Sequence, residues 1–329
     1  MIACRVPTPG RYFVVFRNLY EETKKVDRMK NNVLLVLTAL IWGCAFVAQS
    51  VGMDYVGPFT FNMARFLIGA IVLLPVIWFM DRHRKTGAGA MTSAGSMEKQ
   101  TSGEHKTLII GGICCGTALA VASTLQQWGI LFTTVGKAGF ITAMYIVIVP
   151  LLGVFIGKKV RPLIIGCVVI AVVGFYFLCM TESLRLGLGD FLVLLCAIAF
   201  SIHILVIDHF SPKVDGVKMS AIQFLTAAII SAVPTLLWEQ PVLTEIFQAW
   251  QPVLYAGVMS CGVAYTLQII AQKNADPTVA SLLLSLESVF SVLAGWVLLG
   301  QGLSLKELFG CVLIFCAIIL AQLPEKKKM

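Results

Sequence analysis

The stretch Pro277–Leu299, PTVASLLLSLESVFSVLAGWVLL, is apolar along its length and contains one acid, Glu287. At a helical rise of about 1.5 Å per residue, a segment of this length crosses a bilayer hydrocarbon core of about 30 Å. An ionisable side chain near its middle is unfavourable unless it faces protein or water. The residues on the same helical face as Glu287 are mainly small, which is typical of a face that packs closely or lines a cavity: Ala280, Leu284, Ser291 and Ala294. The stretch therefore predicts a membrane-spanning helix whose acid is functional or is held by a partner.

The composition of the whole chain indicates an integral membrane protein. Of the 329 residues, 58% are hydrophobic and 13% are charged, which is more apolar surface than a soluble domain can bury. A net charge of +8 would suggest nucleic-acid binding in a soluble protein, whereas in a membrane protein basic residues anchor the cytoplasmic side. The ten cysteines lie mostly inside apolar runs and form no C-x-x-C pair, so neither a metal site nor a disulfide framework is indicated.

The apolar runs predict an all-α integral membrane protein with ten transmembrane helices. Most connections are short, but the segment 81–106 is rich in Gly, Ala, Ser and charge and is expected to form a flexible loop. The predicted spans lie at about 33–53, 58–79, 107–129, 137–156, 162–180, 189–208, 219–238, 252–272, 278–299 and 305–322.

The lysines and arginines predict the orientation of these spans. With the N-terminus inside, nearly all of the 25 basic residues fall in cytoplasmic segments. The connections on the other side hold only Lys137, Arg185 and Lys306, and Arg65 lies within the second span. Both termini are therefore predicted to be cytoplasmic.

An internal repeat divides the chain into two halves of five spans. Phe66-Leu67-x-x-Ala70-Ile71 recurs as Phe224-Leu225-x-x-Ala228-Ile229 at an offset of 158, and Thr124-Leu125-Gln126 recurs as Thr266-Leu267-Gln268 at an offset of 142. Because five is odd, the second half enters the membrane upside down, as in alternating-access transporters built from inverted repeats.

The predicted organisation has a cytoplasmic tail at 1–32, a first repeat at 33–180, a second repeat at 189–322 and a basic tail at 323–329. Since Met29 directly precedes the first span, we hypothesise that part of the N-terminal tail is an upstream start-site extension.

Several motifs resemble those of EamA-type members of the drug/metabolite transporter (DMT) superfamily. They are IWGCAFVA from Ile41, NMARFLIGA from Asn62, LQQWGILFTTVGKAGFITAMYIVIVPLLG from Leu125 and QKNADPTVASLLLSLESVFSVLAGWVLLGQGLS from Gln272. The resemblance implies a ten-helix, inverted-repeat carrier of the plasma membrane with a central substrate cavity. The chain departs from the family pattern in having Gly157-Lys158 and Gly300-Gln301 where Gly-Glu is common, and Phe200-Ser201 where a Trp is common.

Two charged residues inside spans are candidates for a substrate-binding cavity. Arg65 has Gln223 as its counterpart in the second repeat, so the fold does not require the charge; the alternative is an arginine that snorkels or bonds helix-end carbonyls. Glu287 has Tyr145 as its counterpart, and the two positions are expected to face each other between the halves. Burial disfavours the charged form of a carboxyl group, so Glu287 could carry a proton or bind a substrate amine; the alternative is a packing carboxylate bonded to nearby serines.

Amide and aromatic side chains complete the candidate cavity. Tyr265, Gln268 and Gln272 recur at the spacing of one helical face, and Gln126 and Gln127 occupy the matching part of the third span. Such groups hydrogen-bond either a ligand or a neighbouring helix. Trp42 could stack on an organic substrate or belong to the core, and His203, alone on its span, is interpreted as a core histidine.

The sequence thus predicts a secondary-active transporter, and an exporter in particular, for small organic metabolites such as amino acids or related compounds, with a proton as a candidate coupling ion. No catalytic residue, metal ligand or cofactor is assigned, because G-x-x-x-x-G-K-[ST], H-E-x-x-H and G-x-S-x-G motifs do not occur. The expected partners are a small-molecule substrate and the lipid bilayer, with no nucleic acid. A membrane-embedded enzyme, or a non-transporting sensor or scaffold, is the alternative; the first would need clustered acids or histidines at one face and the second a soluble output domain.

Overall fold

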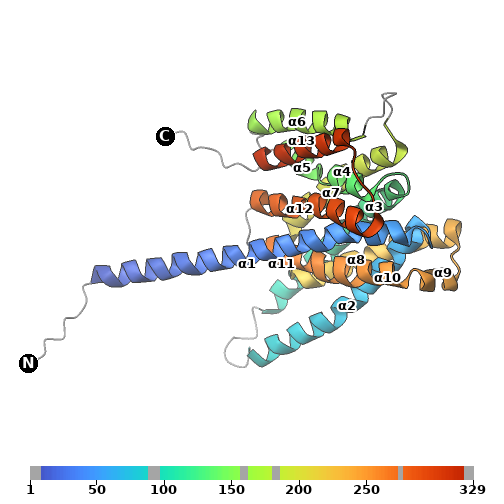
Figure 1. Cartoon of the computed structure of the whole chain (residues 1–329). Coiled ribbons are helices and arrows are strands. Elements are labelled where there is room, and N and C mark those ends of the chain that lie inside the picture. The colour runs from blue at the N-terminus through green and yellow to red at the C-terminus, as the bar shows by residue number, and fades with distance from the viewer. Residues whose placement is uncertain (1–8, 88–96, 156–161, 180–185, 273–276, 322–329) are drawn as a thin grey trace, which may run out of the picture.

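The structure is a computed structural model that describes residues 9–87, 97–155, 162–179, 186–272 and 277–321. Side chains are described over a narrower set, in essence 29–82, 103–154, 162–178, 186–271 and 283–320. Within these ranges the fold is all-helical (Figure 1). The helices are α1 (Pro9–Gly52), α2 (Pro58–Gly87), α3 (Met97–Ile130), α4 (Val135–Thr142), α5 (Tyr145–Phe155), α6 (Pro162–Cys179), α7 (Leu188–Phe210), α8 (Gly216–Pro234), α9 (Leu243–Gln248), α10 (Trp250–Leu254), α11 (Thr266–Gln272), α12 (Pro277–Leu299) and α13 (Leu305–Ala321), with a 3-10 turn η1 (Ser211–Lys213) and two π-helices, η2 (Thr235–Glu239) and η3 (Tyr255–Tyr265).

Seven helical segments of the described chain are long and apolar enough to cross a membrane. Two shorter apolar helices, Ile165–Leu178 and Leu283–Leu299, accompany them. The chain is therefore an all-helical, multi-pass membrane protein. The seven segments are Met29–Gly52, Pro58–Arg82, Gly103–Ile130, Val135–Val154, Leu188–Lys213, Gly216–Glu239 and Trp250–Ala271.

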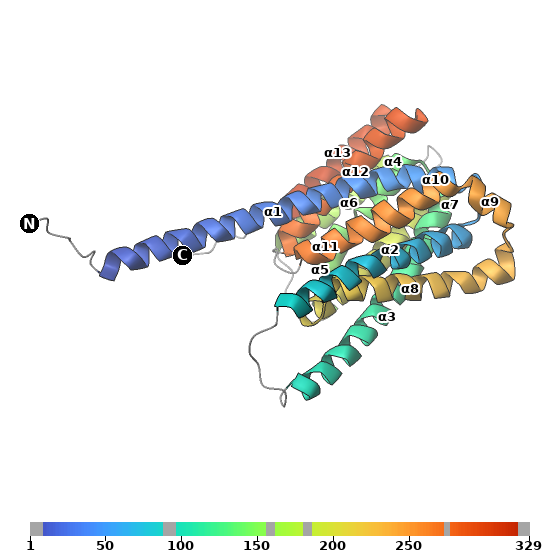
Figure 2. The ribbon, with the colours of Figure 1, turned by 90° about the horizontal axis from the view of Figure 1, so that it is seen from below.

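Some helices extend further than the apolar runs predicted. α1 already begins at Pro9, inside the expected polar tail, and continues beyond the bundle in Figures 1 and 2. α2 ends only at Gly87 and α3 begins at Met97, so much of the predicted loop at 81–106 is helical. The apolar pattern marks where a helix is in the membrane, whereas helical hydrogen bonding continues through polar residues that tolerate it.

Two predicted spans are not regular α-helices. The span at 137–156 is divided into α4 and α5, and Ala143 and Met144 between them form a tightened turn in which the Met144 N–H donates to the carbonyl of Ile141. The span at 252–272 is α10, the π-helix η3 and α11 in succession. Both irregular stretches lie inside the bundle, where other helices can satisfy the backbone groups that they free.

The helices pack in pairs around the middle of the bundle. α1 lies along α12, α3 along α7, α2 along α8 and α6 along α13. Close contacts depend on residues without side chains: a Cβ atom at Gly174 would lie 2.9 Å from the carbonyl oxygen of Gly310, and one at Gly310 would lie 2.7 Å from that of Gly174. Such mutual glycine contacts allow α6 and α13 to approach at backbone distance.

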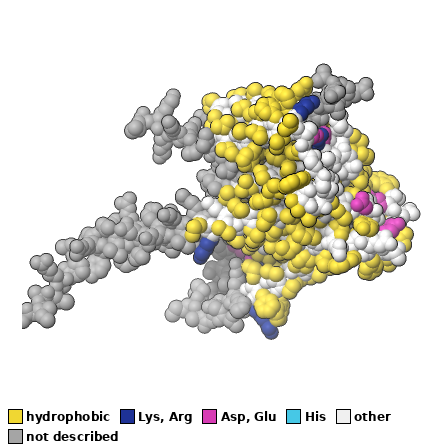
Figure 3. All heavy atoms as spheres, in the orientation of Figure 1, with side chains coloured by type: hydrophobic (Ala, Val, Ile, Leu, Met, Phe, Trp, Pro, Cys, Tyr) yellow, Lys and Arg dark blue, Asp and Glu magenta, His cyan; other side chains and the backbone are white. Residues whose placement is uncertain are grey.

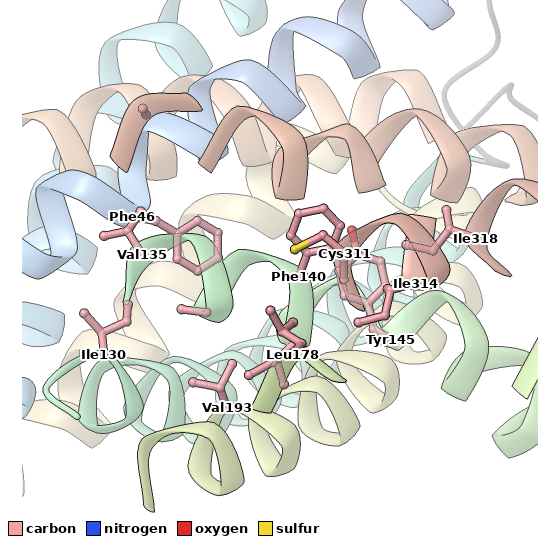
Figure 4. Close-up of a cluster of buried hydrophobic side chains, with 14 of the residues drawn as sticks. Phe46, Ile130, Val135, Phe140, Tyr145, Leu178, Val193, Cys311, Ile314 and Ile318 are labelled. Atoms are coloured by element: carbon pink, nitrogen blue, oxygen red, sulfur yellow. The ribbon is translucent and has the colours of Figure 1, made fainter. Parts of the chain in front are cut away.

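The largest buried apolar cluster joins α4 and α5 to α12 and α13. Phe140, Tyr145, Leu178, Ile314 and Ile318 belong to it, and Figure 4 shows their side chains gathered between these helices. The face of the bundle that Figure 3 shows is also largely hydrophobic, which fits a protein surrounded by lipid.

One end of the bundle carries the short helix α9. At this α9 end, α1 and α3 finish and α2 and α4 begin. Acidic side chains gather there in Figure 3. Glu239 holds the start of α2, because its carboxylate accepts hydrogen bonds from the backbone N–H groups of Phe59 (2.9 Å) and Thr60 (2.6 Å).

Candidate functional site

A cavity of about 520 Å³ lies inside the bundle between seven of its helical segments. Its walls come from α1, α2, α3, the α4–α5 junction, α7, the η3–α11 segment and α12. The lining residues are Trp42, Ala45, Phe46, Gln49, Arg65, Gln126, Thr142, Tyr145, Phe200, His203, Ile204, Ser260, Tyr265, Gln268 and Glu287.

Most of the residues proposed from the sequence meet in this cavity. Arg65, Glu287, Trp42, Tyr145, Gln126, Tyr265 and Gln268 all line it. Gln127 does not; it is fully buried beside the cavity, and its amide donates to the backbone carbonyl of Gln49 at 3.0 Å. The side chain of Gln272 lies outside the described residues.

The two charged side chains of the cavity are buried without ion pairs. Arg65 and Glu287 are each 4% exposed, and within the described chain neither forms an ion pair with a partner at 4.0 Å or less. The guanidinium carbon of Arg65 lies 4.7 Å from the centre of the Phe66 ring, a cation–π contact that holds it in place. Nε of Arg65 and Oε1 of Glu287 have no hydrogen-bond partner among the described residues. A buried cation and a buried anion that do not neutralise each other are free to interact with a ligand.

Tyr145 lies at the same wall as Glu287. Its hydroxyl lies close enough to the Glu287 carboxylate to interact with it, although the two groups do not meet the geometry of a regular hydrogen bond. The helix is interrupted between α4 and α5, directly before Tyr145, whereas α12 is continuous through Glu287. The two repeat counterparts are thus both at the cavity, one at a helix break and the other within an intact helix.

Aromatic rings form another part of the cavity wall. The Trp42 and Tyr265 ring centroids are 4.7 Å apart, and His203 meets Tyr265 edge-on at 6.2 Å. The indole N–H of Trp42 donates to the carbonyl of Ser260 at 3.4 Å. Nε2 of His203 lies 3.3 Å from Oε1 of Gln223, so this histidine is both hydrogen-bonded, as expected of a core residue, and part of the cavity wall.

The π-helix η3 decides which residues of its span reach the cavity. Ser260 and Tyr265 both line it although they are five residues apart, a spacing that lies on one face of a π-helix but not of an α-helix. α1 braces this stretch, because Thr38 donates to the carbonyl of Ala264 (3.4 Å) as Trp42 does to that of Ser260.

The amides supply hydrogen-bonding groups on two sides. Gln126 donates to the Thr142 hydroxyl at 3.3 Å, which connects α3 to the α4–α5 junction. Oε1 of Gln268 and Oε1 of Gln49 have no partner among the described residues. The cavity can therefore accept hydrogen bonds from a ligand and offer both signs of charge to it.

Sequence reasoning did not single out several lining residues: Phe46, Thr142, Phe200, Ile204 and Ser260. Phe200 could have been found, since it is the counterpart of Trp42 at the repeat offset of 158. Among the side chains that the structure describes, no group of three His, Cys, Asp or Glu residues is placed to hold a metal ion.

Comparisons with known proteins agree with this architecture. The model of the EamA-like transporter family matches residues 29–180 and 187–323. An uncharacterised transporter of Archaeoglobus fulgidus is 29% identical over 91% of this chain and 87% of its own length. The uncharacterised transporter YoaV of Bacillus subtilis is 24% identical over 87% of this chain and 94% of its own length. One solved crystal structure superposes with a TM-score of 0.61 at 19% identity, covering 89% of this chain and 96% of that chain, and so shares the fold.

The family model covers both halves of the chain and nearly all of the described helices. With its apolar helices and its buried, polar cavity, the chain belongs to the EamA-like transporter family of the drug/metabolite transporter superfamily and is a multi-pass membrane transporter.

Proposed function

We propose that the protein is a secondary-active exporter of amino acids or closely related zwitterionic metabolites. The observation that carries the proposal is the pair of unneutralised charges, Arg65 and Glu287, in one cavity lined by aromatic rings and amides. The ligand's carboxylate binds the Arg65 guanidinium and its ammonium binds the Glu287 carboxylate, so that each buried charge gains the partner that it lacks. The apolar part of the ligand packs on Trp42 and Tyr265.

Alternating access between two inverted five-helix halves is the proposed mechanism of transport. Helix packing supports it, because exchanging the two repeats converts the observed pairs into one another. The pair α1–α12 corresponds to the contacts of α7 with α4 and α5. The pair α3–α7 corresponds to η3–α1, and the pair α3–α8 corresponds to η3–α2. The pairs α2–α8 and α6–α13 each correspond to themselves. Such a relation is expected when a two-fold axis lies in the membrane plane and passes through the cavity.

Polar contacts at the two ends of the α2–α8 pair support the same relation. Asp81 at the end of α2 forms an ion pair with Lys218 at the start of α8, at 2.8 Å. Glu239 at the end of the segment that follows α8 binds the backbone and the hydroxyl of Thr60 at the start of α2. At the offset of 158, Asp81 corresponds to Glu239 and Thr60 to Lys218, so the two contacts are repeat counterparts.

The proposed orientation places the α9 end outside the cell and both termini in the cytoplasm. The basic residues support it, since the connections at the α9 end hold few of them. The proposed membrane is the plasma membrane, where an exporter acts.

We further propose that Glu287 couples export to proton entry. A proton from the outer side neutralises the carboxylate and displaces the ammonium of the ligand; on the inner side the proton leaves and a new ligand binds. One carboxylate thus binds either a proton or a substrate amine, which makes the two exchange. The unpartnered Oε1 of Glu287 and its exposure to the cavity support this role.

Transport in proteoliposomes tests the proposal. We expect counterflow of at least one amino acid by the wild-type chain, and stimulation of net flux by a pH gradient. Glu287→Gln should lose the gradient effect and weaken binding of the ligand's ammonium group, whereas Arg65→Gln should weaken binding of its carboxylate group and keep any remaining flux sensitive to the gradient. Glu104→Gln, an exposed acid on α3 that lines no pocket described here, is the matched control. Absence of flux above empty vesicles for amino acids, nucleobases and drugs alike would contradict the proposed transport.

A further inference from the structure

A second pocket opens at the α9 end, beyond the central cavity. It has a volume of about 530 Å³ and is lined by the end of α1, the α1–α2 turn, the start of α2, Leu131 and the segment before α9. Three acids face it: Asp54, Glu239 and Glu245. Acids around an opening raise the local concentration of cations, including hydronium.

Three buried amides lie where the wall of the central cavity leads toward this pocket, one on each of three helices. On α1, Gln49 lines the cavity, and Met53 one turn further on lines the pocket. On α2, Asn62 lies between Thr60 of the pocket and Arg65 of the cavity.

On α3 the same order recurs, with Gln127 between Gln126 of the cavity and Leu131 of the pocket. Gln49, Asn62 and Gln127 are called the amide layer below. Each of the three helices therefore runs from the cavity to the pocket and carries one residue of the amide layer on the way.

Contacts between α1, α2 and α3 place the three residues of the amide layer at a similar depth along the bundle. The Gln127 side chain donates to the backbone carbonyl of Gln49. Next to Gln127, the Trp128 ring meets the Phe59 ring of α2 at 5.3 Å. A Cβ atom at Gly52 of α1 would touch the Phe61 ring, whose neighbour in sequence is Asn62.

The amide layer contains buried polar atoms that no side chain or backbone group in the described part of the chain satisfies. Oε1 of Gln49, both amide atoms of Asn62 and Oε1 of Gln127 have no hydrogen-bond partner among the described residues. Asn62 and Gln127 are fully buried, and Gln49 is 4% exposed. Unsatisfied amides destabilise a closed, dry conformation relative to one in which water reaches them.

The fold does not require polar residues here, as the other repeat shows. The counterparts of Gln49 and Gln127 are Ile207 and Ile269, which pack in a single apolar cluster. The counterpart of Asn62 is Ser220, whose hydroxyl donates to the carbonyl of Gly216 at 3.0 Å. In one half of the chain these three positions are apolar or hydrogen-bonded. In the other half they are amides with atoms that lack a partner among the described residues.

We propose that Gln49, Asn62 and Gln127 form a gate for water and protons between the central cavity and the pocket at the α9 end. The gate is closed in this structure. A small separation of α1, α2 and α3 admits water, which hydrogen-bonds the free amide atoms and forms a path for a proton from the acidic pocket to the cavity wall. The proton enters as hydronium and leaves its water when it binds the Glu287 carboxylate, so no other reactant is needed. The delivery of this proton to Glu287 rests on the proposed function, whereas the hydration of the gate does not.

Cysteine accessibility tests the hydration without any transport. In the purified full-length chain, Asn62→Cys and its counterpart Ser220→Cys are treated with 2-aminoethyl methanethiosulfonate, and modification of each peptide is followed by mass spectrometry with the wild-type chain as the blank. We expect Asn62→Cys to react at least about ten-fold faster, because only its site opens to water. Equal rates at the two positions would overturn the proposal.

Sealing the gate tests its role in transport. Asn62→Leu replaces two unsatisfied atoms with an apolar group, so its unfolding temperature should equal or exceed that of the wild type. A lower unfolding temperature would show that Asn62 has a partner and would also overturn the proposal. In proteoliposomes, Asn62→Leu should keep counterflow but lose about ten-fold of the flux driven by a pH gradient, while Ser220→Leu keeps both. An unchanged gradient-driven flux in Asn62→Leu refutes the gate, whereas absence of counterflow in the wild type refutes the proposed function instead.

Discussion

Phe66 and Phe224 stack on each other with their ring centroids 6.2 Å apart and their planes inclined by 9°. They are the same residue of the repeated F-L-x-x-A-I motif, 158 positions apart, and both are fully buried. Under the proposed exchange of the two halves, such a pair of equivalent residues in contact would lie on the two-fold axis. On one side of this stack lies Arg65 over the Phe66 ring, and on the other Tyr265 meets Phe224 edge-on at 5.6 Å. The stack therefore connects the proposed axis to two residues of the cavity wall, Arg65 and Tyr265.

Truncation of the stack should separate stability from binding. Phe66→Ala and Phe224→Ala each remove a fully buried ring and should lower the free energy of unfolding by about 3–5 kcal/mol. Only Phe66→Ala also removes the ring under the Arg65 guanidinium, so only this variant should weaken ligand binding beyond its loss of stability. Thermal unfolding and ligand-binding titration of the two variants, side by side, provide the measurement. Equal loss of affinity in both variants would argue against a positioning role for Phe66.

The two polar contacts at the ends of the α2–α8 pair should differ in strength. The Asp81–Lys218 ion pair is partly exposed and should contribute about 0–1 kcal/mol. Glu239 accepts two backbone N–H groups at a helix start, so Glu239→Ala should destabilise the fold by about 1–2 kcal/mol. Hydrogen exchange of the first turn of α2 should rise in Glu239→Ala and stay unchanged in Asp81→Ala. The reverse order would mean that the ion pair, and not the helix cap, holds these helices together.

Contacts between α4 and the helices α12 and α13 should hold the α9 end closed. Oε1 of Gln301 accepts the N–H of Val135 at 3.0 Å, and Lys137 forms an ion pair with Glu307 at 2.6 Å. The repeat counterpart of Val135 is Pro277, which has no N–H, so the opposite end cannot form the same cap.

Weakening these contacts should therefore increase the population of conformations that are open at the α9 end. In Gln301→Ala combined with Glu307→Gln, distances between spin labels at Phe132 and Leu305, measured by electron paramagnetic resonance, should lengthen relative to the parent. Both labelled positions are exposed, and Glu245→Gln on α9 should leave the distances unchanged. Unaltered distances in the double variant would assign the closure to apolar packing alone.

A side chain at Gly43 should disturb the helix that carries Glu287. A Cβ atom there would overlap Phe290 and lie 3.0 Å from the carbonyl oxygen of Glu287. Gly43→Ala should consequently displace α12 and reduce both unfolding temperature and ligand affinity. Gly166→Ala, where nothing lies within 4 Å of the added Cβ, is the control and should change neither. Normal affinity in Gly43→Ala would show that the added methyl group displaces α1 and not α12.

Polar residues are conspicuous in apolar spans, and most of those singled out from the sequence lie in the wall of one cavity. Arg65, Glu287 and Gln126 are unfavourable in lipid and must face the interior, so their location follows from solvation alone. Gln126 and Gln127 show the limit of this reasoning, since neighbours on a helix point about 100° apart and only one of them reaches the cavity. Polarity identifies a buried pair, but not which of its members lines the cavity.

Backbone irregularities explain most of what could not be predicted. An apolar pattern does not distinguish an α-helix from the π-helix at Tyr255–Tyr265, because both bury the same residue types. The lining by Ser260 depends on that wider helix, and the lining by Thr142 depends on the break before Tyr145. These features result from contacts with other helices, such as the bonds from Thr38 and Trp42 to backbone carbonyls of η3.

The π-helix has a consequence for how the substrate range of this chain could change during evolution. Loss of one residue from Tyr255–Tyr265 would convert one wide turn into an α-helical one, so that turn would absorb the lost residue and α11 would keep its orientation. Gln268 would then stay in the cavity wall, whereas Ser260 and Tyr265 could no longer share one helical face. Homologues that differ by a single insertion or deletion in this stretch should accordingly select different substrates while retaining the lining that the other helices contribute.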